Sequence, residues 1–162
     1  MSRLDSVIRR LKAQRACLDE ATSMVDGKSG HVLELGLGNG RTYDHLREKL
    51  PNRDIYVFER QVNAHPDCIP PEDKLFLGNL EDTLLEARDK LGATADLLHS
   101  DIGTGDPDRN RKFATWLSSI YPDLMASGGV ILSDQELTLD DFDQLPLPQD
   151  VQVGRYYFYQ KK

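Results

Sequence analysis

The segment His31-Val32-Leu33-Glu34-Leu35-Gly36-Leu37-Gly38-Asn39-Gly40-Arg41-Thr42 decides how this chain folds. Its first five residues, 31–35, are mostly apolar and predict a short buried strand. Three glycines follow directly, and then a helix is predicted over Arg41–Leu50 that ends before Pro51. Glycine adopts positive φ and lets the main chain approach a ligand without a Cβ in the way. Because ligands of open parallel sheets bind beyond the carboxyl ends of the strands, the segment predicts a ligand-binding turn.

Strands and helices alternate along the rest of the chain. Apolar runs predict strands over Asp54–Phe58, Lys74–Leu77, Ala95–Ser100 and Val130–Ser133, and helical spacing predicts helices over 80–91 and Arg109–Ala126, the latter ended by Ser127-Gly128-Gly129. At the end of the chain, Val151–Val153 and Tyr156–Gln160 flank Gly154-Arg155, which predicts a β-hairpin. The pattern is typical of the α/β class. We predict a Rossmann-like, doubly wound, mainly parallel seven-stranded sheet that ends in an antiparallel hairpin, with helices on both faces.

The length of 162 residues fits one domain, 1–162. Within it, residues 1–28 hold a helix with apolar residues at helical spacing and several arginines, which we expect to pack on the domain or to cap its site. No apolar run is long enough to cross a bilayer, and we expect no membrane contact and no secretory signal. Two cysteines without metal-site spacing favour the cytoplasm and argue against a disulfide scaffold or a zinc site.

The net charge of −7 is unevenly distributed, since ten acids and only three bases lie between Asp101 and Asp150. Nucleic-acid binding depends on Lys and Arg that neutralise phosphates. We therefore expect no nucleic-acid partner and favour a small-molecule substrate.

The ligand class follows from what surrounds the glycines. A dinucleotide site would carry GxGxxG, but the third position is Arg41 and the glycines follow GxGxG instead. A carboxylate, Glu34, stands two residues before the first glycine, where it would repel a pyrophosphate and attract a cationic sulfonium. At the end of the second strand, Glu59 is positioned to accept hydrogen bonds from both hydroxyls of a ribose.

With these motifs the sequence resembles the class I S-adenosylmethionine-dependent methyltransferases of a compact bacterial type, over His31–Lys162. The segment 34–40 is similar to the family's first motif, Glu59 to its ribose-binding acid, and Gly78-Asn79-Leu80-Glu81 to its adenine-side segment. The resemblance implies S-adenosylmethionine as cofactor and S-adenosylhomocysteine as product. It implies these cofactor-binding residues: Glu34, Gly36, Leu37, Gly38, Asn39, Gly40, Thr42, Glu59, Arg60, Asn79, Leu80, Ser100 and Asp101.

The resemblance implies in-line methyl transfer, for which alignment of the acceptor supplies most of the catalysis. Asp101 is the candidate general base, with a purely structural or cofactor-binding role as the alternative, and His99 is expected to be a buried structural histidine. No metal is assigned, although Asp101 with Asp134-Gln135 is similar to the metal ligands of some O-methyltransferases. A non-catalytic cofactor-binding protein and a nicotinamide-dependent oxidoreductase are the competing functions. The acceptor, its pocket and homodimerisation are left open.

Overall fold

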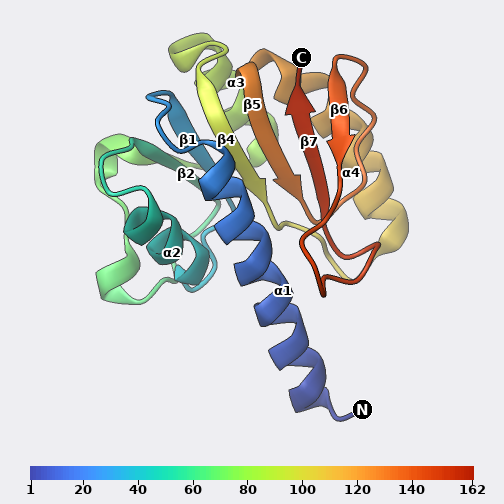
Figure 1. Cartoon of the computed structure of the whole chain (residues 1–162). Helices are drawn as coiled ribbons and strands as arrows, with labels where there is room; N and C mark the ends of the chain where they lie inside the picture. Colours follow the sequence, from blue (N-terminus) through green and yellow to red (C-terminus); the bar gives the residue numbers. More distant parts are fainter.

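The computed structural model describes residues 1–162 as one seven-stranded sheet in the order β3-β2-β1-β4-β5-β7-β6. Only β7 runs antiparallel to its neighbours, and in Figure 1 its arrow points opposite to those of β4 and β5. The predicted doubly wound sheet with a terminal antiparallel strand pair is confirmed. The strands are β1 (His31–Leu35), β2 (Ile55–Glu59), β3 (Leu75–Leu77), β4 (Ala95–Ser100), β5 (Met125–Ser133), β6 (Phe142–Leu145) and β7 (Tyr157–Lys161).

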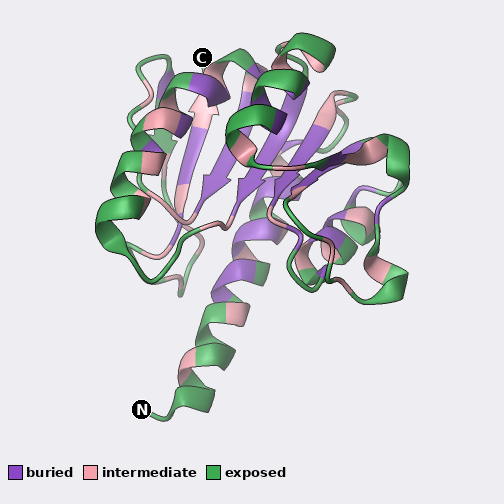
Figure 2. Ribbon diagram, turned by 180° about the vertical axis from the view of Figure 1, so that it is seen from behind, coloured by how far each residue is buried: buried purple, intermediate pink, exposed green.

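Two layers of helices cover the sheet (Figures 1 and 2). Helices α1 (Arg3–Met24) and α2 (Arg41–Lys49) pack on one face, where Leu18 and Leu46 share a core with Val32. Helices α3 (Leu80–Leu91) and α4 (Pro107–Ile120) pack on the other face. Short 3-10 turns lie at Pro66–Cys68, Glu72–Lys74 and Tyr121–Asp123. No helix is both long and apolar enough to cross a bilayer.

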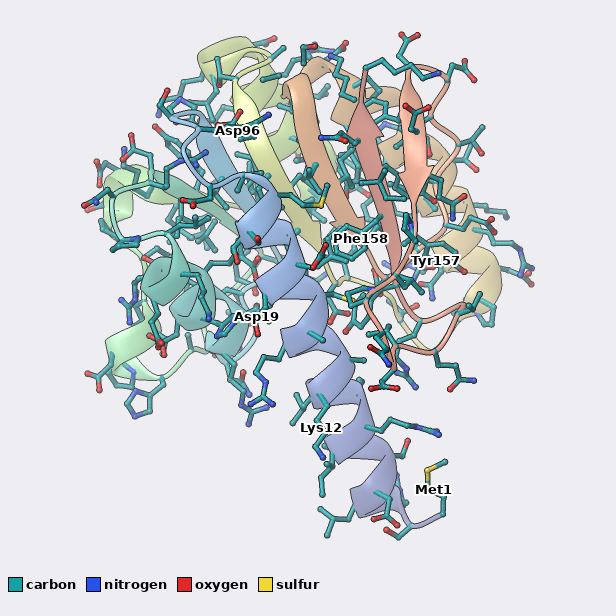
Figure 3. The ribbon with its side chains drawn as sticks, viewed as in Figure 1. Met1, Lys12, Asp19, Asp96, Tyr157 and Phe158 are labelled. Atoms are coloured by element: carbon teal, nitrogen blue, oxygen red, sulfur yellow. The ribbon has the colours of Figure 1, made fainter.

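The two halves of α1 have different surroundings. A capping box starts the helix, because the Ser2 hydroxyl accepts from the Asp5 amide and the Asp5 carboxylate accepts from the Ser2 amide, both at 3.0 Å. The first three turns then project past the ends of the strands into solvent, with Met1 just before them and Lys12 on them (Figure 3). From Ala13 onward the helix is anchored, and Asp19 ties it to α2 through His45 at 2.8 Å.

The terminal strand pair uses a different segment from the one that the sequence predicts. Residues 151–153 form a loop, and β7 pairs instead with β6, in a register that joins Phe142 to Lys161 and Leu145 to Phe158. Val153 is 86% exposed, so its apolar side chain has no core to enter. The prediction of a two-residue hairpin at Gly154-Arg155 is therefore wrong, and the connection between β6 and β7 is a long loop.

The helix predicted to reach Ala126 ends six residues earlier. α4 stops at Ile120, and Pro122 lies in the 3-10 turn that follows, where its ring prevents continuation of the helix. β5 already begins at Met125, which pairs with Ala95 of β4. The segment 127–129, expected to end the helix, is part of β5.

A buried ion pair lies at the amino-terminal ends of the strands. Arg53 and Asp96 meet at 2.7 Å with side chains 9% and 8% exposed, and the Gly30 amide donates to the same carboxylate at 2.6 Å. Figure 3 places Asp96 far from the projecting end of α1. The cluster therefore stabilises the side of the sheet where the strands begin, away from the projecting end of α1.

Candidate functional site

A cavity of 1110 Å³ lies at the carboxyl ends of the parallel strands. Its walls come from the turns that follow β1, β2, β3 and β4, together with one side of α1 and one side of α4. This is the edge where open parallel sheets bind ligands, because each strand there delivers its following loop to the same place. The volume of 1110 Å³ is slightly above the range of about 300–1,000 Å³ that is usual for small-molecule pockets.

Hydrogen bonds to Glu59, at the end of β2, fix the conformation of the glycine turn after β1. One oxygen of the Glu59 carboxylate accepts from the amides of Leu37 and Gly38, at 2.8 and 3.0 Å. The other oxygen accepts from the Arg60 amide at 2.7 Å. Gly36 has φ +84°, and a Cβ there would lie 3.2 Å from the Ile102 side chain. The turn therefore lies against the β4 loop with its main chain facing the cavity.

Most of the residues implied by the sequence line this one cavity. They come from four separate loops, and the fold brings them together as expected for one ligand. The residues are Gly36, Leu37, Gly38, Asn39, Thr42, Glu59, Arg60, Asn79, Leu80 and Asp101.

Glu34 does not line the cavity, contrary to the charge argument made from the sequence. Its side chain is fully buried, and its carboxylate accepts from the Thr42 hydroxyl and meets Nδ1 of His99 at 2.7 Å. The strand pairing explains this, since Glu34 and His99 are direct neighbours on β1 and β4 and point to the same face. The carboxylate thus anchors the first turn of α2, and His99 is the buried structural histidine that the sequence predicts.

Burial alone would lower the pKa of His99, but the Glu34 carboxylate, with smaller contributions from Asp101 and Asp134, raises it above the ordinary value. The imidazolium form is therefore favoured inside the protein. Nε2 of His99 has no hydrogen-bond partner among the protein atoms.

Gly40 and Ser100 also lie outside the cavity wall. Gly40 has φ +87°, and a Cβ there would come within 2.4 Å of the Cys68 Cβ, so this glycine permits close packing of the 61–71 loop on the start of α2. Ser100 is completely buried, and its hydroxyl accepts from Tyr121 at 2.9 Å. Both residues therefore support the cavity wall through packing and hydrogen bonding, without lining the cavity.

Asp101 is half-buried at the end of β4, where it faces the cavity. Its Oδ2 accepts from Gln14 Nε2 at 2.5 Å and from the Tyr156 hydroxyl at 3.3 Å. These donors are neutral, and the carboxylate makes no ion pair. It is therefore an anionic acceptor group held by α1 on one side and by the segment before β7 on the other.

A second cavity of 470 Å³ adjoins the first. The two share the lining residues Arg10, Asp101, Thr104 and Asn110. Behind Asp101, the second cavity reaches Asp134 at the end of β5 and the loop 152–156.

The environment of Asp134 raises the pKa of its carboxyl. Burial is the largest cause and the charge of Asp101 the next, and donation from Gln135 and from the Gly103 amide, the latter at 2.8 Å, offsets them only in part. Gln135 turns its amide nitrogen to the same carboxylate at 3.0 Å. No cluster of three or more His, Cys, Asp or Glu side chains arranged to hold a metal ion occurs in the structure.

Several lining residues were not found from the sequence as site residues. Arg10, Leu11 and Gln14 belong to α1, which the sequence predicts to pack on the domain or to cap its site, without indicating which of its residues would do so. Phe113 and Trp116 of α4 also line the cavity, with stacked rings whose centroids are 5.5 Å apart. Amphipathic spacing gives no signal that separates a residue packed on a sheet from one beside a cavity.

Comparisons with known proteins show the family to which the chain belongs. A family model described as S-adenosyl-L-methionine methyltransferase matches residues 1–161. The crystal structure of an S-adenosyl-L-methionine methyl transferase from Silicibacter pomeroyi DSS-3 is 44% identical, with a TM-score of 0.93, and the match covers 100% of this chain and 99% of that one. No curated protein sequence matches.

More distant solved structures share the fold. SAH-bound Podospora anserina methyltransferase PaMTH1 has a TM-score of 0.54 at 17% identity, and the match covers 100% of this chain and 80% of that one. Human methyltransferase-like protein 13 in complex with SAH has a TM-score of 0.57 at 12% identity, covering 94% and 81%. Together with the family match, the glycine turn and its Glu59 support identify the cofactor as S-adenosylmethionine. The chain belongs to the S-adenosyl-L-methionine methyltransferase family.

Proposed function

We propose that this methyltransferase holds S-adenosylmethionine in the 1110 Å³ cavity and transfers its methyl group to a small molecule in the adjoining 470 Å³ cavity. The observation that carries the proposal is the junction of the two cavities at Asp101, which lines both. The methyl donor and the acceptor would then lie next to each other, beside the Asp101 carboxylate.

The wall of the larger cavity fits each part of the cofactor. After accepting from three amides, the Glu59 carboxylate has a lone pair left on Oε1 for a ribose hydroxyl. Asn79 makes no side-chain hydrogen bond at the start of α3, so its amide is available to the adenine edge beside Leu80 and Ile102. The glycine turn leaves main chain next to the methionine part.

The protein supplies orientation and a proton acceptor, and the bound cofactor supplies an activated methyl group on a positively charged sulfur. Asp101 is positioned by Gln14 and Tyr156, and it is the group that takes a proton from an acceptor that reacts only after deprotonation. Exclusion of water falls to α1, because Arg10, Leu11 and Gln14 cover one side of the cavity.

The size of the second cavity supports a small acceptor. It is less than half as large as the first and is bounded by side chains from α1, the β4 and β5 loops and the loop 152–156. The acidic stretch 101–150 disfavours nucleic acid. We also propose a cytoplasmic enzyme, since Cys17 and Cys68 are both free thiols.

The proposal is tested with methyl-labelled S-adenosylmethionine and a cell extract separated by size. We expect label in the fraction of small molecules; label that appears only in protein or nucleic acid would overturn the proposed acceptor class. The Asp101→Asn variant should bind S-adenosylhomocysteine with unchanged affinity in calorimetry and lose about 100-fold or more in kcat. Unchanged kcat in that variant would remove Asp101 from the mechanism.

A further inference from the structure

Two arginines whose guanidinium groups have no partner in the protein line the smaller cavity. Arg10 comes from the exposed part of α1 and Arg155 from the loop before β7, and both line the 470 Å³ cavity. Neither side chain makes a hydrogen bond or an ion pair within the chain, whereas Arg53 and Arg47 each bind both carboxylate and carbonyl oxygens. Two unpaired guanidinium groups from distant parts of the chain therefore converge on one small cavity.

The same cavity also contains two carboxylates without a cationic partner. Asp101 is bound only by neutral donors, Gln14 and Tyr156, and Asp134 only by neutral amides. The two acids are close enough that the charge of Asp101 raises the pKa of Asp134. A positively charged group placed between them would relieve their repulsion.

The cavity thus holds groups of both charges: Asp101 and Arg10 line it where it meets the cofactor cavity, and Asp134 and Arg155 line the smaller cavity alone. Guanidinium groups bind carboxylates through paired, charge-assisted hydrogen bonds. An occupant that pairs with the acids and with the arginines carries an amine and a carboxylate in one small molecule. The volume of 470 Å³ is within the usual range of about 300–1,000 Å³ for small-molecule sites.

We infer that the methyl acceptor is a small amino acid, with its amine at Asp101 and Asp134 and its carboxylate on Arg10 and Arg155. This inference rests on the proposed assignment of the two cavities and specifies the acceptor that the second one takes. It also specifies nitrogen as the methylated atom.

The reaction balances with these groups. The acceptor enters as an ammonium ion and gives one proton to the Asp101 carboxylate, which leaves a neutral amine with a free electron pair. That pair forms the new N–C bond while the C–S bond breaks, and the electrons of the broken bond stay on sulfur as a neutral thioether. The product leaves as a methylated ammonium ion with the same charge as the substrate, and Asp101 returns its proton to solvent, which restores the carboxylate.

The first test is a panel of acceptors in matched sets. Amino acids, their amides and the corresponding hydroxy acids are compared by the rate of S-adenosylhomocysteine formation. We expect turnover with one or more amino acids, and neither the amides nor the hydroxy acids should replace them. Equal turnover of the amides would overturn the role of the two arginines. Turnover of hydroxy acids that requires Mg²⁺ would overturn the amine and assign the two carboxylates to a metal.

The second test uses Arg155→Gln, because Arg155 lines only the smaller cavity. We expect the KM for the amino acid to rise about tenfold or more, with kcat within about twofold of the wild type. Arg9→Gln is the matched control, since Arg9 is exposed next to Arg10 and lines neither cavity. An unchanged KM in Arg155→Gln would contradict the inference.

Calorimetry with S-adenosylhomocysteine separates the two levels of failure. Normal binding with no turnover of any amino acid would overturn the inference and leave the cofactor site intact. If the wild-type protein does not bind S-adenosylhomocysteine at all, the proposed function itself is overturned.

Discussion

At the scale of single residues, Glu59 connects the local fold to cofactor binding. Three main-chain amides donate to its carboxylate, and the same side chain lines the large cavity. A carboxylate that already orders the glycine turn loses little freedom when a ligand hydroxyl joins it, so binding benefits from preorganisation.

We expect Glu59→Ala to weaken S-adenosylmethionine binding by about tenfold or more, because hydrogen bonds to a charged group contribute about 1.5–3 kcal/mol. Titration calorimetry gives the Kd. Glu81→Ala is the matched control, since Glu81 also lines the cavity but makes no hydrogen bond or ion pair through its carboxylate. A similar loss in both variants would show that general charge in the cavity matters and that the contact with the turn does not.

The buried Glu34–His99 pair predicts a particular dependence of stability on pH. The pKa of His99 is raised in the folded protein above its ordinary value of 6.5, so the stabilisation from the pair is fully present below about pH 6.5. It is lost as the pH rises through the higher pKa of the folded state, where the imidazolium gives up its proton.

We therefore expect the difference in unfolding free energy between the wild type and Glu34→Gln to be largest below about pH 6.5 and to shrink at higher pH. Urea titrations between about pH 5.5 and 9 measure it. His65→Gln controls for the loss of an ordinary titrating group, because that imidazole is 66% exposed. A difference that stays constant across the range would contradict a charged pair.

At the scale of elements, α1 combines an anchor and a wall. Leu18, 1% exposed, packs in the core, whereas Leu4 on the projecting turns is 68% exposed. Leu18→Ala should lower the free energy of unfolding by about 2–5 kcal/mol through lost burial and an empty cavity. Leu4→Ala, the same chemical change on the same helix, should alter it by less than about 0.5 kcal/mol. Urea denaturation compares the two, and a large loss from Leu4→Ala would mean that the projecting turns are buried in solution.

Helices and strands could be predicted from the sequence where the local residue pattern favours the same structure as the pairing with neighbouring strands. β4 begins and ends at the predicted residues, because the run Ala95–Ser100 has an apolar centre and is buried along its whole length. β6 escaped prediction since Asp141, Asp143 and its other polar neighbours resemble a loop, and only the pairing with β7 makes it a strand. Long-range pairing of this kind leaves no local signature.

The site follows the same division. Glu59 and Asp101 were predictable because strand ends must face the ligand edge. The burial of Glu34 was not, since it depends on His99 lying opposite in the neighbouring strand. Likewise, Arg10 and Gln14 reach the cavities only because α1 crosses the sheet at one particular angle, which helical spacing does not determine.

At the scale of the whole molecule, stability and ligand binding depend on opposite edges of the sheet. Every loop of the two cavities follows the carboxyl end of a strand, whereas the Arg53–Asp96 pair joins β4 to the turn before β2 at the amino ends. Both its side chains are less than 10% exposed, so the pair is well shielded from water.

Because the ion pair and the cavities lie at opposite ends of the strands, Asp96→Asn should reduce the free energy of unfolding without changing the affinity for the cofactor. Removal of one partner leaves the Arg53 guanidinium buried and uncompensated, and we expect the free energy of unfolding to fall by about 3 kcal/mol. The melting temperature should then fall by roughly 6–12 °C, at about 2–4 °C per kcal/mol for a domain of this size. The Kd for S-adenosylhomocysteine should stay within about twofold of the wild-type value, and the ligand at 100 times its Kd should stabilise both proteins by about 2.7 kcal/mol. Thermal unfolding with and without the ligand measures both quantities in one experiment. A ligand-induced gain that shrinks in Asp96→Asn would mean that the two edges are coupled through the sheet.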